Sequence, residues 1–224
     1  MKKKLIIGVT SLVLVAAMAI GGTLAFMTQK TATMTNTFTA AAGLSGEIRE
    51  PLWDGYQFGE TKTGNSQPDG AAAKTGITGD ELAALGITKA NTMTPGLDIP
   101  KDPTLKNTSA VPVYMAIKVT YETKAKFDAI ASFALDNKWI KATAAEYTAA
   151  DSEIYFYKGT AADLAEVLAG ETTSALFDKV TIKTTATTET LTSNQFHITV
   201  IGGAVQTSNI EASVAKTELV NLLK

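Results

Sequence analysis

The sequence predicts an all-β protein with short helices, most simply a jelly-roll or immunoglobulin-like antiparallel β-sandwich. Three observations predict this class: segments with a two-residue apolar period, turn-rich connections between them, and helical segments that are few and short. The chain has 224 residues, of which 45% are hydrophobic, enough for one full-sized core. We therefore expect a single β-sandwich domain over residues 44–224 and no internal repeat.

Residues 113–121 form the clearest predicted strand, because every second residue is large and apolar. These residues are Val113, Met115, Ile117, Val119 and Tyr121. Further strands are expected at 104–107, 153–157, 179–184 and 195–201. In the last of these, Phe196, Ile198 and Val200 should face the core, and Gly202-Gly203 predicts a bulge or bend.

Short helices are indicated by capping patterns, in which Ser or Thr precedes an acidic residue by three positions. The pairs are Thr78 with Glu81, Thr160 with Asp163, and Ser208 with Glu211. A further helix is expected over 124–135, because Phe127, Ile130 and Ala134 share a helical face. Residues 59–79 lack apolar periodicity and predict a mobile surface insert.

The N-terminus has the three parts of an export signal: basic Lys2 to Lys4, an apolar run over 5–20, and small residues before Phe26. Cleavage between Ala25 and Phe26 would satisfy the small-x-small rule and define residues 1–25 as a signal peptide. The alternative is an uncleaved anchor, since the apolar run approaches the ~20 residues that span a membrane. The membrane would then be a partner only through the uncleaved signal.

Charge and composition exclude several function classes. Removal of residues 1–25 leaves 17 of the 20 basic residues against 22 acidic ones, and Arg49 is the single arginine. Nucleic acid is therefore not an expected partner, since its binding requires clustered Lys and Arg. Cysteine is absent, which excludes disulfides, thiolate metal sites and Cys nucleophiles.

We expect no catalytic residue, no metal site and no cofactor. His197 is the only histidine, and its strand alternation directs it away from the apolar side, so we interpret it as solvated. The phosphate-loop pattern is missing. Asp98 with Asp102, or Asp151 with Glu153, could contribute to a calcium site, but their spacing matches no known loop and favours solvated turns. Trp53 and Trp139 are interpreted as packing residues and not as ligand-stacking ones.

Residues 31–39 form a second strongly alternating segment, with Thr at every odd position. Its even positions carry Ala32, Met34, Asn36 and Phe38, which predicts a strand with one mostly apolar face. The segment contains no proline, and in the stretch from Phe26 the only charge is Lys30. Such an unprotected strand is an edge-pairing hazard that natural proteins usually suppress.

Three groups of residues resemble the TasA/camelysin (CalY) family of exported biofilm-matrix proteins. The first is Gly-Gly-Thr-Leu-Ala-Phe at 21–26 followed by Asn-Thr-Phe-Thr-Ala at 36–40, which is similar to proteins processed by a SipW-type signal peptidase. The second comprises Thr-Pro-Gly at 94–96, Lys-Asp-Pro at 101–103 and the segment 106–114. The third comprises 175–180 and 204–206.

The resemblance implies a jelly-roll subunit that is exported to the cell surface or extracellular matrix, where copies join head to tail into fibres. The implied linkage is donor-strand complementation, in which residues 26–43 of one copy fill a groove in the next, with Ala32, Met34, Asn36 and Phe38 as the polymerisation residues. The partners would be copies of the chain itself, the SipW-type peptidase and, if filaments need one to form, an accessory fibre protein.

Two alternatives remain open at this point. Residues 26–39 could be the first strand of their own sandwich. The chain could also be a monomeric surface binding module or adhesin that recognises its ligand through its loops, which the insert at 59–79 favours. A camelysin-like surface metalloprotease is the other alternative, although a lone His197 makes a conventional zinc site hard to build.

Overall fold

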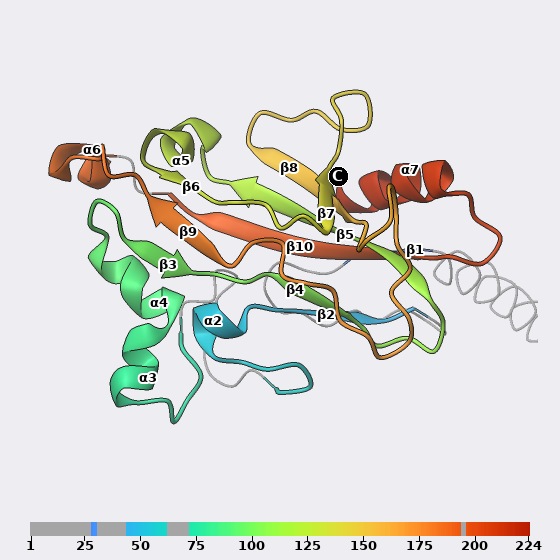
Figure 1. The fold of residues 1–224 in the computed structure, drawn as a ribbon, viewed down its shortest axis with the longest axis horizontal. Helices are drawn as coiled ribbons and strands as arrows, with labels where there is room; N and C mark the ends of the chain where they lie inside the picture. The colour runs from blue at the N-terminus through green and yellow to red at the C-terminus, as the bar shows by residue number, and fades with distance from the viewer. Residues whose placement is uncertain (1–27, 31–43, 62–71, 194–195) are drawn as a thin grey trace, which may run out of the picture.

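The computed structural model describes residues 28–30, 44–61, 72–193 and 196–224. Over these residues the chain is mostly antiparallel β-sheet with a few short helices, which confirms the predicted all-β class (Figure 1). The described strands form a five-stranded, a three-stranded and a two-stranded sheet.

The five-stranded sheet has the order β1-β10-β5-β8-β7 and is antiparallel throughout. Its strands are β1 (Thr28–Lys30), β10 (Ile198–Gln206), β5 (Val113–Tyr121), β8 (Ser152–Tyr157) and β7 (Trp139–Lys141). The long central pair β10 and β5 is in register from Ile198 opposite Tyr121 to Gln206 opposite Val113. This uninterrupted strand pair is the centre of the five-stranded sheet.

Two smaller sheets complete the β framework. The three-stranded sheet has the order β3-β9-β6, with β3 (Asp98–Pro100), β9 (Lys179–Ile182) and β6 (Ala131–Ser132). The two-stranded sheet pairs β2 (Gly46–Arg49) with β4 (Thr104–Asn107).

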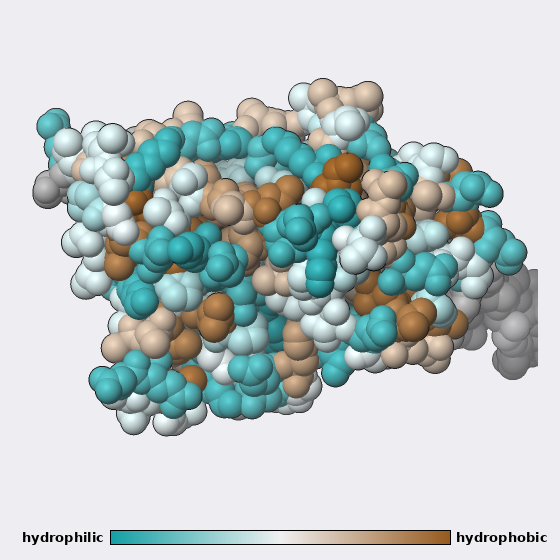
Figure 2. Space-filling model, viewed as in Figure 1, coloured by the Kyte–Doolittle hydropathy of each residue, from teal (hydrophilic) through white to brown (hydrophobic). Residues whose placement is uncertain are grey.

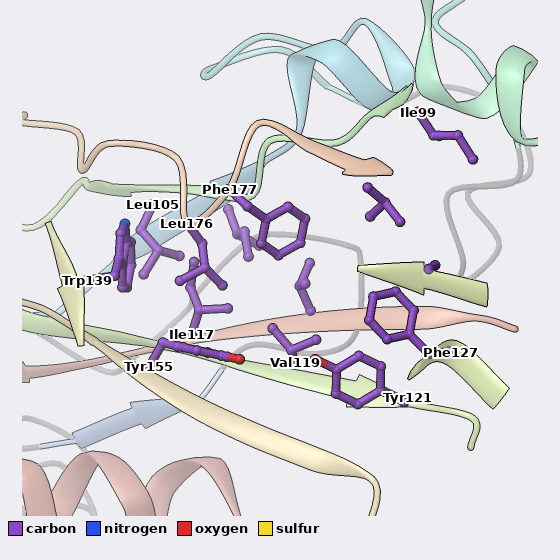
Figure 3. Close-up of a cluster of buried hydrophobic side chains, with 14 of the residues drawn as sticks. Ile99, Leu105, Ile117, Val119, Tyr121, Phe127, Trp139, Tyr155, Leu176 and Phe177 are labelled. Carbon is purple, nitrogen blue, oxygen red and sulfur yellow. The ribbon is translucent and has the colours of Figure 1, made fainter. Parts of the chain in front are cut away.

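All three sheets contribute to one main hydrophobic core. The core-facing residues of β5 predicted by alternation are all buried in it. In Figure 3, Ile117, Val119 and Tyr121 lie opposite Leu105, Leu176 and Phe177, which come from other segments of the chain. Val200 is buried in this core and Phe196 and Ile198 pack against it, as predicted.

A second core lies on the opposite face of the five-stranded sheet, beneath helix α7 (Ala212–Leu223). The helix buries Ala215, Leu219, Val220 and Leu223 against sheet residues that include Phe156 and Val205. Because the large sheet is covered on both faces, β5 and β10 are buried along most of their length.

The remaining helices are short and lie at the periphery. They are α2 (Pro51–Asp54), α3 (Gly79–Ala84), α4 (Gly86–Lys89) with the 3-10 turn η1 (Ala90–Thr92), α5 (Lys124–Ile130) and α6 (Thr188–Ser193). No helix in the described ranges is long and apolar enough to cross a membrane.

Most element predictions are confirmed within a few residues. The strands expected at 104–107, 153–157 and 179–184 correspond to β4, β8 and β9. Thr78 is the N-cap of α3, although its side chain makes no capping hydrogen bond. Phe127 and Ile130 are buried on α5 as expected.

The bulge or bend predicted at Gly202-Gly203 is wrong. Strand β10 continues to Gln206 without a change of register. The glycine at 203 serves packing instead, because a Cβ there would lie 3.1 Å from Leu223 Cγ and 3.2 Å from Leu222 Cδ2. Its lack of a side chain allows α7 to approach the sheet closely.

Three helix predictions need correction. The segment from Thr160 to Leu168 is not helical, because Val167 forms a bridge with Val113 and the Ala165 amide donates to Tyr157 O. The C-terminal helix is capped at Glu211 and not at Ser208. Helix α5 ends at Ile130, where the chain joins β6, so Ala134 lies beyond it.

Candidate assembly edge

Among the described residues, strand β10 has two neighbours in its sheet, β5 and β1. Strand β5 pairs with all nine of its residues, whereas β1 pairs with three, Thr28 opposite Val205, Gln29 opposite Ala204 and Lys30 opposite Gly203. The N-terminal segment thus enters the sheet of its own chain at residues 28–30 (Figure 1).

Strand β10 is covered on both faces. On one face, Val200 and Ala204 belong to the main core. On the other face, Val205 lies in the second core, and α7 contacts both β10 and β1. The N-terminal strand therefore hydrogen-bonds to a strand that is itself buried on both faces, and α7 contacts both of them.

The polymerisation residues predicted from the sequence, Ala32, Met34, Asn36 and Phe38, lie outside the described residues, as do the cleavage positions Ala25 and Phe26. The same holds for residues 62–71 of the predicted mobile insert, 59–79. What the structure adds is the strand that pairs with the N-terminal residues, β10, which the sequence had not indicated. The sequence feature that could have indicated this strand is Gly203 with the apolar residues around it, since such a segment can be buried and paired.

His197 lies on the segment leading into β10 and is exposed as predicted, with 71% of its side chain accessible. Its Nδ1 is 3.0 Å from Glu122 Oε2, and the Glu122 amide donates to His197 O. The hydrogen bond to His197 lowers the pKa of Glu122. The pair lies at the end of the β10–β5 ladder and joins these two segments.

Glu153 is the centre of a polar cluster on β8. Its Oε2 accepts hydrogen bonds from the hydroxyls of Tyr121 and Tyr155, each at 2.7 Å, and its Oε1 lies 2.6 Å from Lys141 Nζ. Burial alone would raise the pKa of Glu153, but the hydrogen bonds from Lys141, Tyr155 and Tyr121 outweigh it and lower the pKa. The cluster links β5, β7 and β8 and therefore has a structural role.

The other acidic residues considered for calcium lie apart in different local networks. Asp98 binds Lys179 Nζ and Thr181 Oγ1, each at 2.6 Å, and Asp151 accepts the Lys124 amide at 2.7 Å. Across the described part of the chain, no group of three or more acidic or histidine residues could hold a metal ion.

Asp102 is not the solvated turn residue that the sequence predicted. It is partly buried, and its Oδ1 accepts the Leu52 amide at the start of α2 at 2.8 Å. Burial, reinforced by the nearby charge of Glu50, raises the pKa of Asp102 to about 7.

Both tryptophans pack as predicted. Trp139 is buried, meets Tyr157 edge to face and donates its indole N–H to Ser174 O. Trp53 packs against the main core, with the Lys101 ammonium 4.6 Å from its ring centroid. Neither ring is presented to a ligand.

Apolar groups on the face drawn in Figure 2 are scattered among polar ones and do not gather into one large patch. The sheet edge at β10 is therefore a better candidate for assembly than this face. Comparison of the chain with protein-family models, with characterised proteins and with solved structures finds no match.

Proposed function

We propose that the chain is a secreted structural subunit that self-assembles head to tail into extracellular or biofilm-matrix fibres by donor-strand complementation. In this proposal the three sheets form a jelly-roll or immunoglobulin-like sandwich. The residues after the signal, 26–43, are donated to the β10 edge of a neighbouring copy.

The observation that carries the proposal is the pairing of β1, at the N-terminal end of the described residues, with strand β10. Thr28 to Lys30 pair with β10, and α7 contacts both strands. An N-terminal edge strand can be exchanged between identical copies at low cost, since the same hydrogen bonds form in either arrangement. Repetition of a head-to-tail contact gives an open filament.

The remaining partners are those that the resemblance to the TasA/camelysin family implies. A SipW-type peptidase cutting between Ala25 and Phe26 would release the N-terminus for exchange, and an accessory fibre protein could start the filament. The side chains of Ala32, Met34 and Phe38 would fill alternate pockets along the receiving edge, as in strand addition generally.

A monomeric cell-surface binding module is the second candidate function. It is favoured by the pairing of Thr28 to Lys30 within one chain, which already closes part of the β10 edge. A molecule whose entire N-terminal segment stays in its own sheet has no edge to offer to a neighbour.

Electron microscopy and size-exclusion chromatography of residues 26–224 distinguish the two. We expect filaments from 26–224 and a folded, soluble monomer after deletion of 26–39. Phe38→Asp should also abolish filaments, whereas the matched variant Thr37→Asp, on the opposite face of the alternating segment, should retain them. A monomer under all conditions, together with unfolding on deletion of 26–39, would refute assembly and support the binding module.

A further inference from the structure

A buried pair of opposite charges joins two segments of the chain that are distant in sequence. Glu50 connects β2 to α2, and Lys101 follows β3. Lys101 Nζ lies 2.8 Å from Glu50 Oε1, and the two side chains are only 5% and 7% exposed. The Trp53 ring covers the lysine nitrogen at 4.6 Å.

The geometry of this pair is not that of a hydrogen-bonded ion pair. Although Lys101 Nζ is close, Glu50 Oε1 has no hydrogen-bond donor with suitable angles among the described residues. The adjacent Trp53 Nε1 is also buried without an acceptor among them. Burial of charged groups without full hydrogen bonding is unfavourable, so conversion of the pair to a neutral product would remove that cost.

Asp102 is a second carboxyl group near the pair whose charged form is disfavoured, chiefly by burial. It lies next to Lys101 in sequence, and burial together with the Glu50 charge raises its pKa to about 7. Proton transfer from ammonium to carboxylate within the Lys101–Glu50 pair would produce a neutral amine beside a neutral acid. These are the two forms that react to give an amide.

We propose that Lys101 and Glu50 become joined by an intramolecular isopeptide bond. Lys101 Nζ attacks Glu50 Cδ, the carbon bonded to the oxygen that it already contacts. A bond from Nζ to Cδ forms, one Cδ–O bond breaks, and the departing oxygen leaves as water with two protons that come from the ammonium. The ion pair is thereby converted to a neutral amide plus water, with no oxidant, cofactor or activated donor.

The closeness of the two groups is the main factor that would accelerate formation of the amide. Two reactive groups held in contact inside a folded protein behave as if present at effective molarities on the order of 10⁵ M or more. Exclusion of water from the site also protects the product from hydrolysis. The fold holds the pair at the junction of the two-stranded and three-stranded sheets, where each backbone is fixed by strand pairing.

The bond would be a covalent cross-link in a chain that contains no cysteine and therefore no disulfide. It would close a loop from residue 50 to residue 101, which includes α2, α3 and α4. Such a closure restricts the unfolded chain in the way a disulfide does. It would protect the segment between the two sheets against unfolding and proteolysis, and it is independent of the fibre proposal.

Intact-mass spectrometry of the purified full chain, with its N-terminus established, tests the proposal directly. We expect the folded wild-type chain to be lighter than its sequence by one water molecule, and digestion to yield a branched peptide that joins residues 50 and 101. Lys101→Arg should keep its full sequence mass, whereas the matched control Lys179→Arg, at an exposed ion pair, should still lose water.

Glu50→Gln provides a second test, whose result does not depend on whether the Lys101→Arg variant folds. Attack of Lys101 on glutamine would expel ammonia and give a product identical in mass to the cross-linked wild type. A folded wild-type chain that retains its full sequence mass on prolonged incubation would overturn the proposal. Loss of water without the branched peptide would overturn it as well.

Discussion

At the scale of single residues, the polar side chains that matter most are buried ones. Asn107 is fully buried and joins three segments, donating to Val111 O at 2.8 Å and to Val167 O at 2.9 Å and accepting the Ser109 amide. The Asn-Thr-Ser turn is thus a structural device. A polar residue at the end of a predicted strand does not by itself indicate burial, so the role of Asn107 follows from the tertiary structure alone.

Asn107→Ala should lower the free energy of unfolding by about 2–4 kcal/mol, because several buried partners would lose their hydrogen bonds. Urea unfolding would measure the loss. Asn91→Ala is the matched control, since its side chain is exposed and donates one hydrogen bond, to Ile87 O. Its effect should stay within about 0.5 kcal/mol, and equal losses in the two variants would contradict the role of Asn107.

Glu153 should make stability pH-dependent on the acid side. Its pKa is lower in the folded state than the ordinary value of 4.5, so its contribution is present above that value and is lost as the pH falls through the folded-state pKa. Glu153→Gln should lose about 1–3 kcal/mol at neutral pH.

The variant should also show a shallower fall of stability below pH 4.5 than the wild type. Chemical unfolding at a series of pH values measures both effects. A parallel acid response in the two proteins would show that Glu153 is not the group responsible.

At the scale of elements, alternation predicted strands reliably where one face is strongly apolar, as in β5. It did not predict that the opposite face is also covered, because Tyr114 and Ala116 pack beneath α7 through tertiary contact alone. The capping pattern at Thr160 failed for a related reason. Its apolar residues Leu164 and Val167 are needed in two different cores, which a helix there does not satisfy.

Gly203→Ala should weaken the packing of α7 on the large sheet. The added Cβ would crowd Leu222 and Leu223 at 3.1–3.2 Å, and overpacking of this kind costs about 1–3 kcal/mol. Thermal unfolding and amide exchange in α7 would report the effect. The double variant Gly203→Ala/Leu222→Ala should recover part of the loss, and strictly additive losses would contradict direct crowding.

At the scale of the whole molecule, the all-β class was predictable because strand period and turn composition are local properties. The division into three sheets was not, since the order β1-β10-β5-β8-β7 depends on pairing between strands that are far apart in the chain. For the candidate assembly edge, the sequence predicted the N-terminal segment that would be donated and not the strand with which it would pair. Strand β10, the proposed acceptor, is covered by α7 and by the core, and neither contact has a local sequence signature.

The central claim is that the N-terminal strand of one copy occupies the β10 edge of another. Because the chain has no native cysteine, two single-cysteine variants of residues 26–224 can be mixed, Gln29→Cys and Ala204→Cys. These positions are directly opposite in the β1–β10 register, where the spacing suits a disulfide. A mixture of Gln29→Cys with Leu52→Cys, an exposed residue of α2, is the control.

We predict that oxidation of the Gln29→Cys and Ala204→Cys mixture under filament-forming conditions gives a covalent heterodimer linked through residues 29 and 204, and that the control mixture does not. The contradictory result is a mixture that yields no such heterodimer while a single chain carrying both cysteines closes an internal disulfide.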